Sequence, residues 1–183
     1  MSEYAILVNR THPLDKNSIP PDLVEPRIPF EAASGDLKRL LRKEAAEAAE
    51  QLFCLAEREG VLLHGVSGYR PYTRQEELYK AALKKSRSLT AVAPPGCSEH
   101  QTGLALDVSC ASESYELEET FADTPEGKWL ARNASLCGFI LRYPKGKENI
   151  TGFPYEPWHI RYVGIPLAYY LTMSGMTLEE YHG

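Results

Sequence analysis

Two histidines and two carboxylates stand at spacings that suit a metal-dependent hydrolase. His100 and Asp107 lie seven residues apart in one segment, and His159 follows Glu156 by three residues. Two imidazole nitrogens and one carboxylate oxygen make a three-ligand set, which in catalytic zinc sites leaves a fourth position open for water. Zinc brings the pKa of that water towards neutrality and polarises a carbonyl group. Glu156 would then accept the proton of the water as a general base.

The same residues permit other interpretations. A single His or Asp is more often a hydrogen-bonded structural residue than a metal ligand. The order Ser98, His100, Asp107 also permits a serine nucleophile, although no nucleophile elbow surrounds Ser98. From spacing alone, these alternatives stay open.

The elements that must position these residues follow from hydrophobic periodicity and from helix start and stop signals. The helix 73–85 opens on a capping box, Thr73 with Glu76, and Pro125 starts another helix. Helices are expected over residues 36–59, 73–85 and 125–137 and from about 166 and 177, and strands over 61–66, 104–108, 139–143 and 159–163. This order predicts the α+β class, with a small, mostly antiparallel central sheet flanked by helices in a single domain.

The strand pattern also predicts where the chemical groups point. In the strand 104–108, Leu104, Leu106 and Val108 share one face, and Asp107 projects from the other. Glu156 and His159 would lie on opposite faces of a regular strand. The site therefore requires a bend near Pro157, which restricts the preceding residue to extended conformations.

Length and charge limit the class of protein. The chain has 183 residues, with 25 Asp+Glu against 20 Lys+Arg, which predicts one domain: a proline-rich N-terminal arm (1–35) and a catalytic core (36–183). The acidic balance argues against nucleic acid as the main partner. No apolar run can span a bilayer, and no secretory signal opens the chain. This predicts a cytoplasmic location, with removal of a leader as the alternative that the sequence leaves open. The four cysteines form no CxxC pair and are expected to stay reduced.

Four segments, in order, resemble the D-alanyl-D-alanine carboxypeptidases of the VanY type, which are zinc peptidases that trim bacterial cell-wall peptides. They are Ser67–Gln75 (SGYRPYTRQ), Gly96–Asp107 (GCSEHQTGLALD), Gly138–Pro144 (GFILRYP) and Glu156–Gly164 (EPWHIRYVG). Weaker similarity at both ends, in His12–Leu14 and Thr177–His182, makes the chain most similar to the VanXY-type enzymes of vancomycin resistance. Those enzymes combine D,D-dipeptidase and D,D-carboxypeptidase activity.

The resemblance implies a role for each matching residue. It assigns His100, Asp107 and His159 as ligands of a zinc cofactor, Glu156 as the catalytic base, Arg70 as the arginine that stabilises the substrate carbonyl and its oxyanion, and Gln75 and Ser98 as residues that hold the substrate near its terminal carboxylate. A fixed cation suits an oxygen on which charge grows in the transition state. A hydroxyl and an amide can both donate to a carboxylate.

The predicted function is zinc-dependent hydrolysis of the terminal D-Ala-D-Ala bond, in the free dipeptide, in peptidoglycan precursor peptides or in both. The nucleophile would be a zinc-bound water activated by Glu156. The alternatives are a related cell-wall peptidase, such as an L,D-carboxypeptidase or an endopeptidase, and a non-catalytic zinc- or peptide-binding domain. Glu156 and Arg70, present together with the ligands, argue against the last. The expected partner is a small peptide ending in D-Ala-D-Ala, and the oligomeric state is left open.

The acidic stretch 113–123 is most simply a solvated loop. It could instead border the cleft and limit the size of the substrate.

Overall fold

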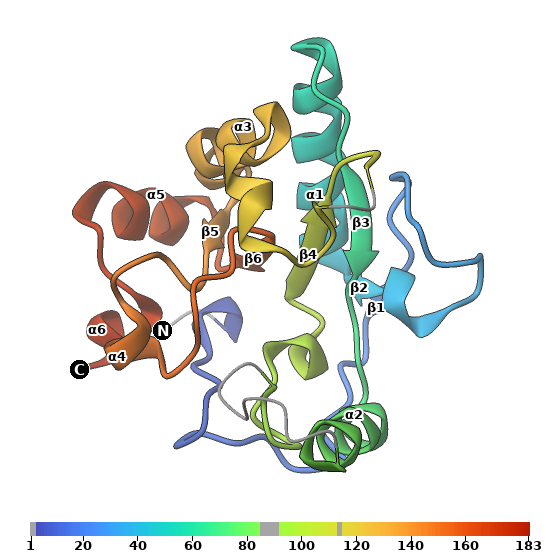
Figure 1. Ribbon diagram of the computed structural model, residues 1–183, viewed down its shortest axis with the longest axis vertical. Coiled ribbons are helices and arrows are strands. Elements are labelled where there is room, and N and C mark those ends of the chain that lie inside the picture. The colour runs from blue at the N-terminus through green and yellow to red at the C-terminus, as the bar shows by residue number, and fades with distance from the viewer. Residues whose placement is uncertain (1–2, 85–91, 113–114) are drawn as a thin grey trace.

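The computed structural model describes residues 3–84, 92–112 and 115–183. Its central sheet has the strand order β3 (His64–Ser67), β4 (Ala105–Ser109), β6 (His159–Tyr162) and β5 (Phe139–Leu141). Every neighbouring pair is antiparallel. Helices flank this sheet (Figure 1), so the predicted α+β class with a small antiparallel sheet is confirmed.

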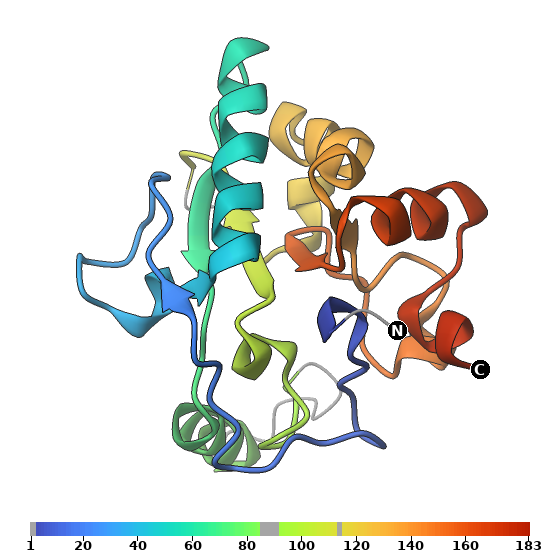
Figure 2. The same ribbon diagram turned by 180° about the vertical axis from the view of Figure 1, so that it is seen from behind.

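The α-helices lie on different sides of the sheet. They are α1 (Lys43–Arg58), α2 (Tyr72–Lys84), α3 (Pro125–Asn133), α4 (Glu148–Thr151), α5 (Ile165–Ser174) and α6 (Leu178–His182). Figure 2 shows α1 in front of the sheet, with α2 and α3 near opposite ends of the molecule. A second, two-stranded sheet pairs β1 (Leu23–Val24) with β2 (Leu41–Arg42).

Short 3₁₀ helices complete the described elements. They are η1 (Glu3–Ala5), η2 (Leu37–Arg39), η3 (Glu99–Thr102), η5 (Glu119–Asp123) and η6 (Ala134–Cys137). Of these, η3 matters most for the site, because it directly precedes β4 and is wholly buried.

The two faces of the sheet differ in chemistry, as the alternation in β4 predicts. Leu104, Leu106 and Val108 are buried in one apolar cluster with the inner face of α1, and Ile160 of β6 joins the same cluster. Because side chains alternate along a strand, Asp107 and its neighbours on β6 are directed to the opposite face. That face carries the polar groups described below.

The helix expected to begin at Asp36 begins instead at Lys43, so this boundary was wrong. Asp36 caps η2, where its side chain accepts a hydrogen bond from the Lys38 N–H. The carbonyls of Lys38 and Leu40 accept hydrogen bonds from the backbone N–H groups of residues 68 and 69. These long-range bonds fix the segment as a 3₁₀ turn followed by extended backbone and outweigh its helical spacing, since tertiary context routinely overrides local propensity.

Smaller boundary differences have local causes. The Val61 N–H donates to the Ala56 carbonyl at the end of α1, so β3 begins later than expected, at His64. Helix α2 begins at Tyr72, which places Thr73 inside the first turn rather than at the cap, and the expected end of this helix at residue 85 lies outside the described residues. The acidic stretch 113–123, expected to be a loop, contains η5.

The described part of the N-terminal arm lies against the segment that contains η3. The Gln101 side chain donates to the carbonyls of Asp15 and Ser18, and the Leu14 N–H donates to the Gly96 carbonyl. The division into an arm and a core stays a prediction. The structure has all four cysteines as free thiols. No helix in the described ranges has the length and apolar character that crossing a membrane requires.

Helix α3 begins at Pro125 as predicted, and its cap gives a test of the fold. The Thr124 hydroxyl accepts a hydrogen bond from the Gly127 N–H at 2.9 Å. Thr124→Ala should lower the free energy of unfolding by about 1 kcal/mol, because it removes an N-cap acceptor. Urea denaturation should show this loss, whereas the control Thr120→Ala, at an exposed position in η5, should change the midpoint little. Equal midpoints for both variants would refute the importance of the cap.

Candidate metal centre and active site

Three buried side chains bring their ligand atoms within 4.8 Å of one another: His100, Asp107 and His159. Asp107 and His159 are directly paired residues of β4 and β6, and His100 comes from η3. Asp107 Oδ2 lies 3.1 Å from His100 Nε2, and Asp107 Oδ1 lies 2.9 Å from His159 Nδ1. The three residues predicted to be ligands therefore converge around one carboxylate.

The orientation of His100 is set by the backbone after β3. His100 Nδ1 lies 2.7 Å from the Gly68 carbonyl oxygen, which can only accept, so Nδ1 donates and the Nε2 lone pair faces Asp107. Only glycine fits at position 68, because a Cβ there would overlap the Leu40 carbonyl oxygen. The Arg70 N–H donates in turn to the His100 carbonyl at 3.1 Å.

The electrostatics of this group favour a cation. Burial raises the pKa of Asp107, but His100 and His159 outweigh burial and hold that pKa well below its usual value. Burial lowers the pKa of His159, but the neighbouring carboxylates of Asp107 and Glu99 outweigh burial and raise the pKa to about 9. Carboxylates thus dominate the local field, which is the setting in which a bound metal ion is stabilised.

The donor set fits zinc. Two imidazole nitrogens and one carboxylate match the three protein ligands of catalytic zinc sites. His100 already has its tautomer fixed by a backbone carbonyl, which is the usual support for a ligating histidine. Among the described residues, His159 Nε2 has no hydrogen-bond partner, and the hydrogen bond of this ring is the one between Nδ1 and Asp107.

A turn places Glu156 beside the three predicted ligands. The His159 N–H donates to the Glu156 carbonyl at 3.2 Å, and the Glu156 N–H donates to the Tyr143 carbonyl at 3.1 Å. This turn is the bend that was predicted near Pro157. It places Glu156 Oε2 3.8 Å from His159 Nδ1. Burial raises the pKa of Glu156 to about 7, with His159 opposing and Asp107 reinforcing the rise. Such a carboxylate is suited to accept and return a proton near neutral pH.

Arg70 also lies close to Asp107. Its guanidinium donates to Gln75 Oε1 at 2.9 Å and to Ser67 Oγ at 3.3 Å, and its Nη2 lies 3.9 Å from Asp107 Oδ2. Gln75 donates through Nε2 to the Ala93 carbonyl at 2.7 Å. Gln75 is therefore fixed at both ends and orients the arginine.

A cavity of about 530 Å³ joins these groups, which is a volume suited to a short peptide. All seven residues singled out in the sequence line it: Arg70, Gln75, Ser98, His100, Asp107, Glu156 and His159. Apolar walls come from Leu78, Leu117, Phe153 and Trp158. The serine-nucleophile alternative lacks its base, because His100 is engaged at one nitrogen by Gly68 and at the other by Asp107.

Sequence reasoning missed a buried charge cluster behind the ligands. Glu99 accepts hydrogen bonds on Oε1 from Arg142 Nε at 2.7 Å and from Arg161 Nη1 at 2.6 Å. Its other oxygen, Oε2, lies 3.5 Å from His159 Nε2. One signal was available: Arg161 follows His159 by two residues on β6, so both share the polar face of the sheet.

Comparisons with known proteins identify the family of this chain. The VanY family, described as D-alanyl-D-alanine carboxypeptidase, matches residues 38–165. YodJ of Bacillus subtilis, named as a carboxypeptidase, is 49% identical over 178 residues, which are 96% of this chain and 65% of YodJ. The chain thus spans less than two thirds of that relative. The bifunctional D-Ala-D-Ala dipeptidase and carboxypeptidase VanXYC of Enterococcus gallinarum is 40% identical over 96% of this chain and 92% of its own.

Solved structures have the same fold. The LD-carboxypeptidase LdcB superposes with a TM-score of 0.91 at 49% identity, over 96% of this chain and 84% of that one. A vancomycin-resistance D,D-pentapeptidase VanY from a VanB-type cassette, solved in complex with Zn(II), gives a TM-score of 0.79 at 33% identity, over 99% of this chain and all of the other. The family match covers more than half of the sequence. This chain belongs to the VanY family of D-alanyl-D-alanine carboxypeptidases.

Proposed function

We propose that this protein is a zinc-dependent carboxypeptidase that removes the terminal D-alanine from peptidoglycan peptides ending in D-Ala-D-Ala. The observation that carries the proposal is the convergence of His100, Asp107 and His159 with Glu156 and Arg70 in one cavity. The relatives support it, because a VanY pentapeptidase was solved with Zn(II) and VanXYC is named for its action on D-Ala-D-Ala.

The proposed mechanism divides hydrolysis between two protein groups. A bound zinc ion would polarise the carbonyl group of the substrate and lower the pKa of the attacking water. Glu156 takes the proton of the attacking water, whose oxygen bonds to the carbonyl carbon, and then returns that proton to the leaving amine as the C–N bond breaks. Arg70 offers a fixed cation to the oxyanion, on which charge grows only in the transition state.

Two further residues are proposed to help bind the substrate, one directly and one through Arg70. Ser98 lines the cavity beside His100 and can donate its hydroxyl to the terminal carboxylate. Gln75 acts in the first place through Arg70, since both ends of its amide are already engaged. A direct contact with the substrate would require Gln75 Nε2 to leave the Ala93 carbonyl.

A second candidate, L,D-carboxypeptidase activity, is favoured by one specific observation. LdcB, named as an LD-carboxypeptidase, superposes with a TM-score of 0.91, against 0.79 for the VanY pentapeptidase. Both reactions release a terminal D-alanine and differ in the residue before it. The same ligands, base and arginine serve either reaction, so the walls of the cavity decide between them. A role in vancomycin resistance and a cytoplasmic location stay predictions.

D-alanine release from matched peptides tests the proposal. The substrates are free D-Ala-D-Ala, a pentapeptide ending in D-Ala-D-Ala and a tetrapeptide ending in an L-residue followed by D-alanine. We expect release from the pentapeptide, loss of release with a chelator, and recovery on addition of zinc. Release from the tetrapeptide alone would replace the D,D assignment by L,D activity. Release from none by folded, zinc-loaded protein would favour a binding role.

Glu156→Gln tests the general base. This change keeps the size of the side chain but removes its basicity, so kcat should fall by about 10²- to 10⁴-fold. Zinc content, measured by metal analysis, should match that of the parent protein. The control Glu148→Gln, at an exposed position in α4, should leave kcat unchanged. Parent-level turnover in Glu156→Gln with zinc bound would rule out the assigned role.

Variants at Leu117 test whether the acidic stretch 113–123 borders the cleft. Leu117 lines the cavity with 42% of its surface exposed and has a φ of 53°, in the left-handed region. Leu117→Ala and Leu117→Gly both remove this apolar wall and should raise KM several-fold with little change in kcat. Because left-handed backbone is strained for non-glycine residues, the glycine variant should be the more stable by up to about 1 kcal/mol. An unchanged KM in both would exclude contact with substrate.

A further inference from the structure

We propose that Glu99 is a positioning residue for the metal centre. It holds the Nε2 edge of the His159 ring, so that Nδ1 faces Asp107 and the metal ion. The inference rests on the proposed zinc function and adds to it a group that contacts neither substrate nor metal.

The first support is the geometry between two buried atoms. Glu99 Oε2 and His159 Nε2 lie 3.5 Å apart, and within the described residues neither has a hydrogen-bond partner. Buried polar atoms are rarely left unsatisfied, so each is the natural partner of the other. A carboxylate oxygen can only accept. With a metal ion bound on the Nδ1 side, where Asp107 Oδ1 now lies 2.9 Å from Nδ1, the remaining ring proton would stand on Nε2 and face Glu99 Oε2.

The second support is the fixed position of the Glu99 carboxylate. The side chains of Glu99, Arg142 and Arg161 are all fully buried. Both arginines donate to Oε1, which leaves Oε2 directed at His159. A buried charge needs pairing to be tolerated, and the two cations supply it. The two arginines therefore fix the Glu99 carboxylate beside the His159 ring without help from a bound metal ion.

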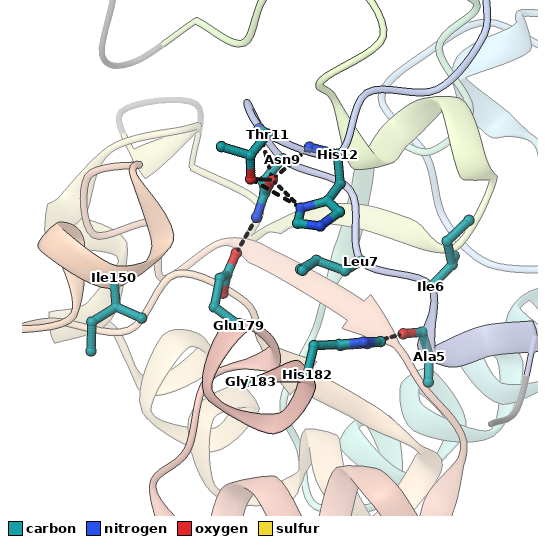
Figure 3. Close-up of a pocket in the computed structure, with 10 residues that line it drawn as sticks. All are labelled: Ala5, Ile6, Leu7, Asn9, Thr11, His12, Ile150, Glu179, His182 and Gly183. Atoms are coloured by element: carbon teal, nitrogen blue, oxygen red, sulfur yellow. Dashed lines mark hydrogen bonds between the residues drawn. The ribbon is translucent and has the colours of Figure 1, made fainter.

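The third support is the anchoring of the arginines themselves. Glu179 of α6 accepts two hydrogen bonds from Arg142, at 2.8 and 2.6 Å. Figure 3 shows Asn9 donating to Glu179, which ties the N-terminal segment to α6. Arg161 Nη2 donates to the carbonyls of Tyr4 and Ile6. The cluster behind His159 is therefore fixed from both the N-terminal segment and the last helix.

Glu179 provides a matched control for substitutions at Glu99. Glu99 and Glu179 both neutralise Arg142, but only Glu99 faces His159. Glu99→Gln and Glu179→Gln each remove one negative charge from the same buried cluster. A merely structural role for Glu99 predicts similar effects of both variants on zinc binding, whereas a positioning role predicts that they differ.

The experiment measures zinc affinity by competition with a zinc-responsive fluorescent chelator, at a temperature where circular dichroism shows each variant folded. Loss of a partner that orients a ligating histidine typically costs 10- to 100-fold in metal affinity. We expect that loss in Glu99→Gln and a change of less than about threefold in Glu179→Gln. Parent-level affinity in Glu99→Gln, or equal losses in both variants, would overturn the proposal.

A second variant keeps the test valid if Glu99→Gln does not fold. Glu99→Asp retains the charge that the arginines need but withdraws the carboxylate from the ring. Zinc affinity should fall, and ¹⁵N NMR of the zinc-loaded protein should show faster exchange of the His159 Nε2 proton than in the parent. Unchanged affinity and exchange would contradict the role of Glu99.

The two proposals can fail separately, because zinc binding is measured without peptide. If the parent protein binds zinc tightly but cleaves no peptide, the proposed function fails and the role of Glu99 is still decided by the variants. If the parent protein binds no zinc, both fail.

Discussion

The contact between Asp107 and the two histidines is the interaction on which the site depends. One carboxylate lies within hydrogen-bond distance of His100 and His159, so it sets the separation of the two rings. Its own position follows from the direct pairing of Asp107 with His159 across β4 and β6. The antiparallel register is therefore a chemical requirement, because a slip by one residue would turn Asp107 into the apolar core.

The two faces of the sheet explain why this register is stable. Leu104, Leu106 and Val108 are buried against α1, and burial of a large apolar side chain is worth about 1.5–3 kcal/mol. That packing holds β4 in place without using the polar face. The polar face can then carry charges that would destabilise an apolar core, provided that each charge is paired. Glu99 with its two arginines meets that condition.

The sequence was informative where local rules apply. Alternation in 104–108 predicted the direction of Asp107, and Pro157 predicted the turn that brings Glu156 beside His159. It misled at residues 36–42, because hydrogen bonds to residues 68 and 69 hold that segment as η2 and β2 instead of the first turns of α1. It gave little sign of Glu99. The partners of Glu99 are Arg142, directly after β5, and Arg161 of β6, and pairing across more than 40 residues leaves no local pattern. The resemblance supplied Arg70, Gln75 and Ser98, which spacing alone would not have joined.

The backbone bonds between the segment after β3 and η3 have a consequence for how the enzyme can change. His100 Nδ1 donates to the Gly68 carbonyl, and the Arg70 N–H donates to the His100 carbonyl, so these hydrogen bonds fix His100 and Arg70 relative to each other. The walls of the cavity come from elsewhere, among them Leu78 of α2, Leu117 and Phe153. Substitutions in those walls can accumulate without altering the distance between the arginine and the ligands. Divergence within such a scaffold would therefore alter which peptide end is accepted sooner than it would alter how the bond is broken.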